Sequence, residues 1–539
     1  MHFTLKEENY VVIENGSYKI KAVRGLGDIN RVPPVLIPTK VGHRIEIERT
    51  DVETSPSVYD NNSAGPNTPI TTTTPITTTT PITTTTPITT TTPITTTTIT
   101  TTTNIATTTT ITTTNVATPP LNTATPPLNI ATPPLNTATP PLNTATTTTT
   151  TTNTTTLSSN INTTNISTNN NNNNDEDDED DDNNNKKEQP KYVFDAQLDE
   201  LREQFDDKVK ITYPIKRGNV VNWEELEALW RHILLKELNI KRARNECPVL
   251  FSVPNSWTKD HYERVTHISF ESFNVPGLYI ANQALMTIYG FGVLTGLVVD
   301  VGYGKTEITP IIDCSIQYHA TQTIPVAGQD FDEYFLSLLL SDKKFMEEYG
   351  EIPDIEFARA IKESPDICQL LEDPDQLNFN EEERMEVEYL EKKFTIGSIR
   401  FKTYDPLFNP EIIGRSGILS LPEAIHLSVM NCDPDKRSTL LENIVVTGGS
   451  SLIKGFKERL EVELRPRFSL SDNYGEYQVK EIRFLKLQDY FTNIRDRPDL
   501  AGFLGASITA KLSFPDPKGF INKVDYNEHG PSVIHTKGY

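Results

Sequence analysis

Two copies of a pattern made of a strand, a glycine turn and a second strand constrain this chain more than any other feature. The first copy has a short apolar strand from Tyr10 to Ile13, an Asn-Gly turn at residues 15 and 16, and a second strand. The second copy, GLVVDVGYGKTEITPIID, is centred on Gly302 and Gly304. Each copy heads its own series of strands and helices. The pattern therefore predicts a duplicated α/β fold with a ligand cleft between its halves.

Helical and strand patterns alternate between and after the two copies. A capping-box pattern followed by apolar residues at helical spacing predicts a helix from about Trp223 to Asn239. The apolar run CPVLFSVP predicts a strand, and we expect a helix around residues 260 to 273 and a strand at residues 278 to 280. Such alternation is typical of a mostly parallel sheet covered by helices. A third glycine turn, at residues 448 and 449, lies between a buried strand and a helix.

A long segment near the start has no residues from which to build a core. Residues 68 to 174 are almost entirely Thr, Asn, Pro, Ile and Ala, without aromatic or charged side chains. Their repeats, PITTTT and ATPPLN, are much shorter than a stacking structural repeat. We therefore expect residues 50 to 190 to form a disordered insertion, which a surface loop tolerates because the cost of loop closure grows slowly with length.

The charge distribution limits the classes of partner. A net charge of -23 argues against general nucleic-acid binding, which requires a basic face. The eight consecutive carboxylates from Asp175 to Asp182 form either a solvated tether or a histone-binding tail. The basic cluster of Lys241, Arg242 and Arg244 is either a nuclear signal or a set of cations that complements the end of a helix.

Cysteine spacing and hydropathy indicate the cellular environment. The four cysteines are far apart and show no CxxC spacing, which argues against a zinc site or a disulfide framework and favours a reducing intracellular compartment. No segment approaches the ~18 consecutive apolar residues of a membrane span, and the first residues lack an apolar signal core. We therefore expect no membrane association.

Three loops give the chain a specific resemblance. ENGSYKIKA, DVGYGKTEITPI and VVTGGSSLIKGFKERL resemble, in order, the two phosphate loops and the adenosine loop of the actin and actin-related protein family. YPIKRGNVVNWEELEALW and the C-terminal VDYNEHGPSVIHTKGY are also similar to actin segments. The resemblance implies the duplicated fold shared by actin, Hsp70 and hexokinase. It places residues 1–49, 191–290 and 500–539 in domain I, residues 291–499 in domain II, and residues 50–190 in the insertion.

The resemblance also implies a nucleotide site, with ATP and magnesium as the cofactors that the cleft could bind. Asp300 would order water on the metal, Lys21 would supply a cation to the phosphates, and Gln283 would orient an attacking water. Structural alternatives stay open: the glycines only make tight turns, Lys362 and Glu363 form an exposed helix face, and Gln283 caps buried backbone. The residues that the family motifs place around the nucleotide are Gly16, Ser17, Lys21, Asp300, Gly302, Gly304, Lys362, Glu363, Gly448 and Gly449.

Several cleft positions depart from the family pattern. Glu14 replaces an aspartate, and Tyr18 replaces a glycine at the edge of the first loop. In the second loop Tyr303, Lys305 and Glu307 replace an aspartate, a small apolar residue and a histidine associated with water activation. A carboxylate near phosphate is unfavourable where little solvent is present to screen the two negative charges. We therefore expect a degenerate ATPase cleft with no catalytic residue and no useful hydrolysis, in which nucleotide binding stays open.

The altered cleft, the insertion and the LIPTKV stretch resemble subunits of the fungal SWI/SNF and RSC chromatin-remodelling complexes. The insertion lies where actin has a loop that reaches the next filament protomer. The resemblance implies a structural subunit in the nucleus that forms no filament and takes part in transcription regulation. Its partners would be a second actin-related protein, a helical segment of the remodeller ATPase and, indirectly, the nucleosome. The alternatives are a divergent actin-related cap of the dynactin filament in the cytoplasm and, with less support, an active ATP-hydrolysing enzyme.

Overall fold

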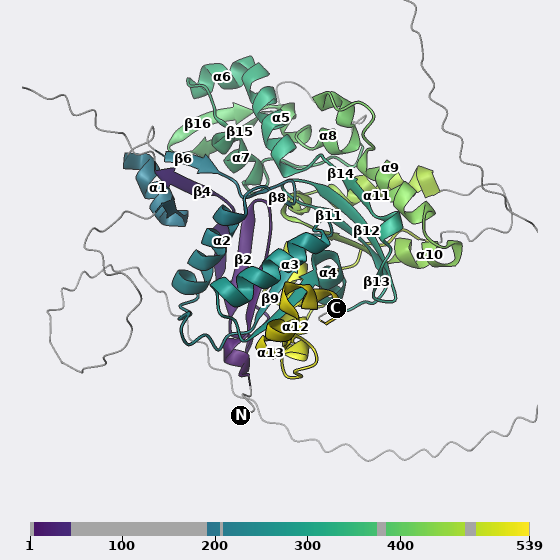
Figure 1. Cartoon of the computed structure of the whole chain (residues 1–539). Helices are drawn as coiled ribbons and strands as arrows, with labels where there is room; N and C mark the ends of the chain where they lie inside the picture. The colour runs from purple at the N-terminus through teal and green to yellow at the C-terminus, as the bar shows by residue number, and fades with distance from the viewer. Residues whose placement is uncertain (1–4, 45–190, 205–208, 374–383, 469–480, 538–539) are drawn as a thin grey trace, which may run out of the picture. The chain divides into compact units, whose positions relative to one another are not determined.

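Two central β-sheets organise the part of the chain that the structure describes. The computed structural model describes residues 5–44, 191–204, 209–373, 384–468 and 481–537. Figure 1 shows β2 and β9 in one group of strands and β11, β12 and β13 in another, with helices around both groups. The predicted insertion at residues 50–190 lies outside the described residues.

The first sheet has six strands in the spatial order β18-β10-β9-β1-β2-β3. The predicted hairpin is β1 paired antiparallel with β2, and β1 also pairs parallel with β9. The C-terminal strand β18 pairs antiparallel with β10 at one edge, so the end of the chain returns to the first sheet. The strands are β1 (Val11–Glu14), β2 (Lys19–Arg24), β3 (Val35–Pro38), β9 (Val249–Val253), β10 (Gly277–Asn282) and β18 (Ile521–Asn522).

The second sheet repeats this plan. Strand β11 pairs antiparallel with β12 through the second glycine turn and parallel with β17, as β1 does with β2 and β9. The duplication predicted from the two motifs is therefore present in the strand pairing. The strands of this sheet are β11 (Gly296–Val301), β12 (Thr306–Ile312), β13 (Ser315–Ile316), β14 (Gln322–Ile324) and β17 (Ile444–Thr447).

The expectation of mostly parallel sheets is wrong. In the first sheet only the pairs β1/β9 and β9/β10 are parallel, and in the described part of the second sheet only β11/β17 is parallel. The physical reason is the glycine turn itself, because a tight turn can only reverse the chain and so forces an antiparallel pair at the centre of each sheet.

Small sheets and hairpins surround the two central sheets. Strand β4 pairs with both β5 and β6, with Gly42 opposite Val193. The chain therefore leaves the described region after residue 44 and re-enters it at an adjacent point. These strands are β4 (Val41–Arg44), β5 (Tyr192–Val193), β6 (Val209–Thr212), β7 (Ile215–Lys216), β8 (Asn219–Val220), β15 (Met385–Tyr389) and β16 (Lys392–Ile396).

The two long helices expected in the first half are each divided. Helix α2 (Trp223–His232) continues as a π-helical turn at Ile233–Glu237, and α3 (Lys259–His267) continues as one at Ile268–Ser272. The Asn222 side chain caps α2 by accepting from the N–H groups of Glu224 and Glu225, as the capping pattern predicts. The extra residue in each π turn shifts the hydrogen bonds from i−4 to i−5.

Helices α4 (Gln283–Phe291) and α12 (Ala501–Ser513) connect the two sheets. Met286 and Phe503 pack in one cluster with Val12 of the first sheet. Ile288 and Leu504 pack in another cluster, which contains Val298 and Val445 of the second sheet. One helix pair thus contributes to both cores and sets the spacing between the glycine turns.

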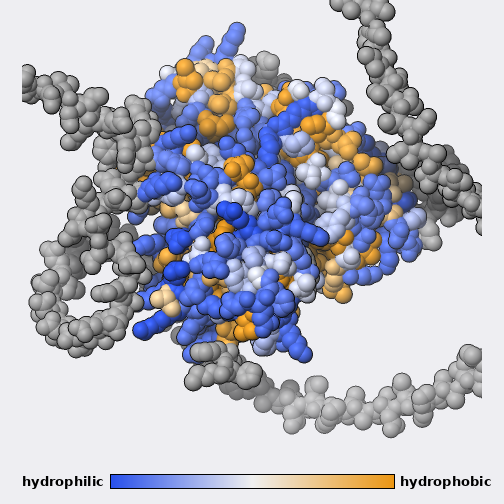
Figure 2. Space-filling view, viewed as in Figure 1, coloured by the Kyte–Doolittle hydropathy of each residue, from blue (hydrophilic) through white to orange (hydrophobic). Residues whose placement is uncertain are grey.

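The remaining helices cover the sheets, and their outer surface is largely polar. Figure 2 shows hydrophilic residues over most of the viewed face, with apolar residues in small separate groups. Within the described part of the chain, no helix is long and apolar enough to cross a bilayer. These helices are α1 (Asp195–Gln204), α5 (Gly328–Ser341), α6 (Lys343–Tyr349), α7 (Ile355–Glu363), α8 (Asp405–Phe408), α9 (Leu421–Met430), α10 (Pro434–Glu442), α11 (Phe456–Phe468) and α13 (Lys523–His529).

We predict that the hydrogen bond between Trp230 and the first glycine turn is required for stability. The fully buried indole of Trp230 donates to the Asn15 side-chain carbonyl at 2.9 Å. Trp230→Phe leaves that acceptor without its donor, which costs about 1–3 kcal/mol, and the smaller ring adds a packing loss. Chemical denaturation would measure the change. Trp223→Phe is the control, because Trp223 is only partly buried, and an equal loss in both variants would contradict the prediction.

Candidate functional site

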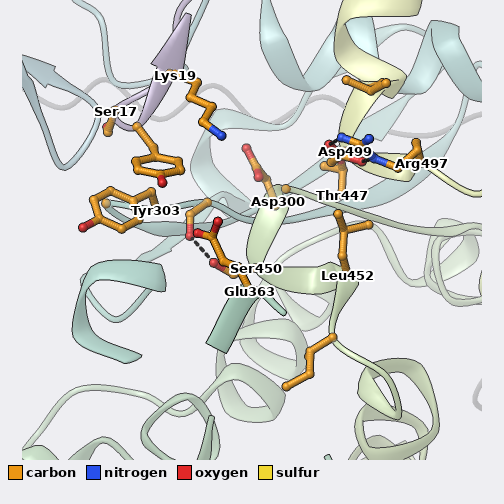
Figure 3. A pocket seen from close by; sticks show the side chains of 18 of the residues that line it. Ser17, Lys19, Asp300, Tyr303, Glu363, Thr447, Ser450, Leu452, Arg497 and Asp499 are labelled. Carbon is orange, nitrogen blue, oxygen red and sulfur yellow. Dashed lines mark hydrogen bonds and ion pairs between the residues drawn. The ribbon is translucent and has the colours of Figure 1, made fainter. Parts of the chain in front are cut away.

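A cavity of about 630 Å³ lies where the glycine turns of the two sheets face each other. It is lined by every residue that the motifs assigned to the nucleotide site, so the fold brings all of them together. In Figure 3 the side chains of Asp300, Tyr303 and Glu363 lie around one part of the cavity, and those of Arg497 and Asp499 lie around another. The predicted residues on the lining are Gly16, Ser17, Lys21, Gln283, Asp300, Gly302, Gly304, Lys362, Glu363, Gly448 and Gly449.

The carbonyl groups of the first loop accept hydrogen bonds from Gln283 and Thr39, and these bonds hold the loop in place. The Asn15 carbonyl accepts from the Gln283 side-chain amide at 2.5 Å. The carbonyls of Gly16 and Tyr18 accept from the hydroxyl of Thr39 at 2.7 Å and from its N–H at 2.8 Å. The N–H groups that follow Asn15 in the turn donate to no other described residue. The loop therefore keeps its backbone donors available while its acceptors are used.

The second loop has the same arrangement. The Gly302 carbonyl accepts from the N–H of Gly328 at 3.1 Å and from the Ser450 hydroxyl at 3.0 Å. The Tyr303 carbonyl accepts from the N–H of Gln329 at 2.8 Å, so the first turn of α5 holds this loop. The N–H groups of the loop from Tyr303 onward donate to none of the described residues before β12 begins. Two facing loops with free N–H groups can bind an anion such as phosphate.

Gln283 has a definite structural role in this arrangement. Its amide holds the first loop through the Asn15 carbonyl, which is the backbone-capping alternative considered for it. A role in orienting an attacking water stays a prediction, because the same amide nitrogen is already engaged. The structure thus gives the residue a function that requires no nucleotide.

Two lysines of the cavity lining, Lys21 and Lys305, pair with neighbouring glutamates. Lys21 forms an ion pair with Glu14 at 3.1 Å and donates to the Asp499 carbonyl at 2.8 Å. Lys305 forms a close ion pair with Glu307. Lys21 and Glu307 are the positions where the family pattern implied a free cation and a water-activating histidine. Each is instead neutralised by a neighbour from this chain.

Asp300 lies between these two pairs. Burial raises the pKa of its carboxyl group to about 6, and the negative charges of Glu307 and Glu14 add to this effect, while Lys305 and Lys21 oppose it. A carboxylate in this environment is costly without a further cation. A metal ion with its coordinated waters would supply that charge, and Asp300 is the residue that would hold it.

The fit of this site to ATP and magnesium is partial. The loop N–H groups and the cavity volume suit the phosphates of a nucleotide, and Asp300 suits a hydrated magnesium ion. Among the described residues no cluster of three or more His, Cys, Asp or Glu side chains is arranged to bind a metal directly. Lys21 and Lys305 are already paired with glutamates, whereas Lys19, an exposed lysine on the same lining, forms no ion pair with the described residues. The chain therefore keeps the shape of a nucleotide site, while two of the lysines on its lining are neutralised by glutamates of the chain itself.

The predicted adenosine-side residues differ in exposure. Glu363 is exposed and lines the cavity, whereas Lys362 is buried and forms an ion pair with Asp332 at 2.5 Å. The alternative in which Lys362 forms part of an exposed helix face is therefore wrong. Burial of a lysine requires a partner, and the fully buried Asp332 of α5 provides it.

Two tyrosines meet across the cavity. The rings of Tyr18 and Tyr303 lie 4.7 Å apart between centroids, and Arg359 of α7 lies 5.3 Å from each ring centroid. Burial raises the pKa of Tyr18 to about 12 and also raises that of Tyr303, so both remain neutral phenols near neutral pH. Two departures from the family pattern thus form one contact.

The sequence motifs did not indicate Arg497, which lines the cavity, or Arg359 and Arg217, which donate hydrogen bonds to the lining residues Tyr303 and Gly304. Arg359 stands one helical turn before Lys362 on α7, and that spacing was an available signal. Arg217 occupies the β7–β8 turn with a φ of +49° and binds the buried Asp330 at 3.0 Å. No spacing in the sequence indicates the pair of Arg217 and Asp330, because the two residues are far apart in the sequence and lie in different elements.

We predict a pH-dependent cost at Asp300. Its pKa is higher in the folded than in the unfolded chain, so its contribution to stability is fully present below about pH 4 and is lost as the pH rises through 6. The free energy of unfolding of the wild type, relative to Asp300→Asn, should fall by on the order of 2–3 kcal/mol between pH 4 and 7. Denaturation at several pH values would test this. The control is Asp313→Asn at an exposed site, and a constant difference at Asp300 would contradict the prediction.

Known proteins with similar sequences support the fold. Residues 151–539 match the family model described as Actin. The chain is 30% identical over 418 residues to the SWI/SNF and RSC complexes subunit arp9 of Schizosaccharomyces pombe, which covers 60% of this chain and 78% of the relative. It is 31% identical over 347 residues to Actin-related protein 2 of Arabidopsis thaliana (62% of this chain and 83% of the relative). It is 30% identical over 336 residues to Actin-related protein 2 of Acanthamoeba castellanii (60% and 82%). Because the family model spans more than half of the chain and the relatives are matched over most of their length, this protein belongs to the actin family.

Proposed function

We propose that this chain is an actin-related protein that forms no filament and acts as a structural subunit of a nuclear chromatin-remodelling complex of the SWI/SNF or RSC type. It pairs with a second actin-related protein on a helical segment of the remodeller ATPase and reaches the nucleosome only through these partners. The similarity to the fission yeast protein, which is named as a subunit of both complexes, supports this proposal.

The ion pairs of Lys21 with Glu14 and of Lys305 with Glu307 are the structural observation that supports this proposal. ATP and magnesium would bring a polyphosphate and its counterion into the cleft, where the loop N–H groups, Lys21 and Asp300 would hold them. Hydrolysis also requires a water that is positioned and activated. Glu307 is engaged by Lys305, and the Gln283 amide is engaged by the first loop. We therefore propose that the ATPase cleft is degenerate and hydrolyses no ATP.

The position of the 45–190 interval supports the absence of filaments. This interval starts and ends at the neighbouring strands β4 and β5. In the family, this part of the chain reaches the next filament protomer. Any ordering of a long polar segment in such a tight interface would cost roughly 1 kcal/mol per residue or more. Self-assembly through that surface is therefore unfavourable.

We assign two domains to the chain. Residues 1–49, 191–290 and 500–539 form domain I around the first sheet, and residues 291–499 form domain II around the second. The pairing of β18 with β10 and the packing of α12 against the first sheet support the return of the C-terminal residues to domain I. The insertion of residues 50–190 then belongs to domain I.

Affinity purification of the tagged endogenous protein at moderate salt, followed by mass spectrometry, tests the proposal first. We expect a remodeller ATPase and a second actin-related protein to co-purify, because the assembly rests on protein contacts rather than on nucleotide. Recovery of dynactin subunits with dynein would contradict this and would indicate a filament-end cap in the cytoplasm.

A charge-neutral variant tests whether the ion pair of Lys21 with Glu14 is only structural. The double substitution Lys21→Met and Glu14→Gln removes one ion pair without leaving a buried charge unpaired. We expect it to fold and to recover the same partners as the wild type, measured by the same purification. Loss of the partners from a variant that still unfolds cooperatively would show that the cleft has a further function. Lys40→Met with Asp199→Asn, at an ion pair outside the cavity lining, is the matched control.

A further inference from the structure

We propose that Arg217 holds the two halves of the molecule together when no ligand lies in the cavity. The first half is packed around the six-stranded sheet and the second half around the five-stranded sheet. We call Arg217 and its partner Asp330 the arginine clasp. The inference rests on contacts within the chain and not on the proposed assembly or on binding of a nucleotide.

The arginine end of the clasp belongs to the first half. Arg217 lies in the two-residue turn between β7 and β8. Ile215 of β7 is buried in the same core cluster as Val11 of the first sheet. The indole of Trp257, a member of that cluster, donates to the Gly218 carbonyl at 3.0 Å. The turn that carries Arg217 is therefore fixed to the first half.

The aspartate end belongs to the second half. Asp330 lies in the first turn of α5, and its side chain is only 1% exposed. Its carboxylate accepts from the N–H of Ala327 at 2.9 Å and so caps the helix. The next residue, Phe331, is buried in the core cluster that contains Val299 of the second sheet. Asp330 is therefore fixed to the second half by both its backbone and its side chain.

Four hydrogen bonds connect the two ends. The Arg217 guanidinium donates to the two carboxylate oxygens of Asp330 at 3.0 and 3.2 Å. It also donates to the Pro325 carbonyl at 2.7 Å and to the Gly304 carbonyl at 3.2 Å. All of these acceptors belong to the second half. A fork of this kind between two opposite charges is stronger than bonds between neutral groups and fixes the orientation of both partners.

The clasp differs in kind from other contacts between the halves. Those contacts include one pair of rings and three single hydrogen bonds: Tyr18 with Tyr303, Asn255 with Thr309, Lys305 with Ser256, and Lys21 with the Asp499 carbonyl. None of these four joins two opposite charges. We therefore expect Arg217 to contribute more than any of them to holding the halves together.

The burial of Asp330 does not itself require Arg217. Arg415, which belongs to the second half, binds the same carboxylate and the same Pro325 carbonyl. A buried carboxylate requires a cation and hydrogen-bond donors, and Arg415 with the Ala327 N–H supplies both. Arg217 differs from Arg415 in that it reaches Asp330 from the other half.

The backbone of the turn does not favour an arginine. Arg217 has a φ of +49° and Gly218 a φ of +78°. A two-residue hairpin turn with positive φ at both positions prefers Asn, Asp or Gly at the first of them. An arginine held there is strained, and such strain persists only where the surrounding contacts compensate for it. The bonds to the second half are contacts of that kind.

The distance between the halves can be measured by double electron–electron resonance on the full-length protein, after treatment with apyrase and EDTA to remove nucleotide and metal. Spin labels would be attached to genetically encoded residues at Lys210 and Ile352, which are both exposed. Lys210 lies in β6, which pairs with β4, and Val41 of β4 belongs to the first core. Ile352 lies between α6 and α7, which share a core cluster with α5.

We expect one short distance in the wild type and a second, longer distance in Arg217→Asn. Asparagine suits the turn, and Asp330 keeps Arg415 as its partner. Loss of hydrogen bonds to a charged group should raise the ratio of separated to closed molecules roughly ten- to hundredfold. Arg217→Lys keeps the charge but not the fork and should give an intermediate ratio.

Arg415→Met is the matched control. It removes one arginine from the same aspartate and the same carbonyl, but it breaks no bond between the halves. We expect its distance distribution to equal that of the wild type. Cooperative unfolding of each variant would show that the fold is retained.

Three outcomes would overturn the clasp. An unchanged distribution in Arg217→Asn would mean that other contacts hold the halves together. The longer distance in Arg415→Met as well would mean that neutralisation of Asp330 matters rather than the connection. Two distances in the nucleotide-free wild type, reduced to the short one by ATP and magnesium, would mean that a ligand closes the molecule and Arg217 does not.

Discussion

The close crossing of α4 and α12 is the constraint on which the rest of the structure depends. A Cβ at Gly290 would lie 2.2 Å from the Ala501 carbonyl oxygen, and one at Gly505 would lie 1.7 Å from that of Met286. No side chain fits at either position, so the two helices approach at backbone distance. Because both helices contribute to the cores of both sheets, this distance fixes how far apart the two glycine turns stand. The width of the cavity is therefore determined by the packing of α4 against α12, at glycines that do not line the cavity.

Electrostatics then decides what the cavity needs. In a site that binds a polyphosphate and its metal ion, the lysines are expected to pair with the phosphates and the carboxylates with the metal. Here Glu14 and Glu307 neutralise Lys21 and Lys305, whereas Asp300 forms no ion pair with the described residues. Ion pairs inside a protein stabilise it only when their geometry compensates for desolvation. A polyphosphate could use these lysines only after their ion pairs were broken, so the pairs oppose the binding of a highly charged ligand.

The sequence was sufficient for the features that repeat locally. The two hairpins, the helix cap at Asn222 and the joint placement of the motif residues around one cavity were all predicted. Contacts between distant segments were not. Tyr18 and Tyr303 were each recognised as unusual, but their contact depends on the distance set by α4 and α12, which no local pattern encodes. The same holds for Arg217 and Asp330, and the π turns after α2 and α3 give no periodic signal of their own.

The glycines of the motifs show why motif identity and nucleotide use are separate questions. A Cβ at Gly304 would lie 2.7 Å from the Cα of Arg217, and Gly448 has a φ of +89° with its Cα against the Asp300 carboxylate. Contacts within the protein alone therefore require glycine at both positions. The same contacts would require it whether or not a phosphate is ever bound. A chain of this family can thus replace the residues that act on the nucleotide while it retains the loops that once surrounded it, because those loops are also where its two halves meet.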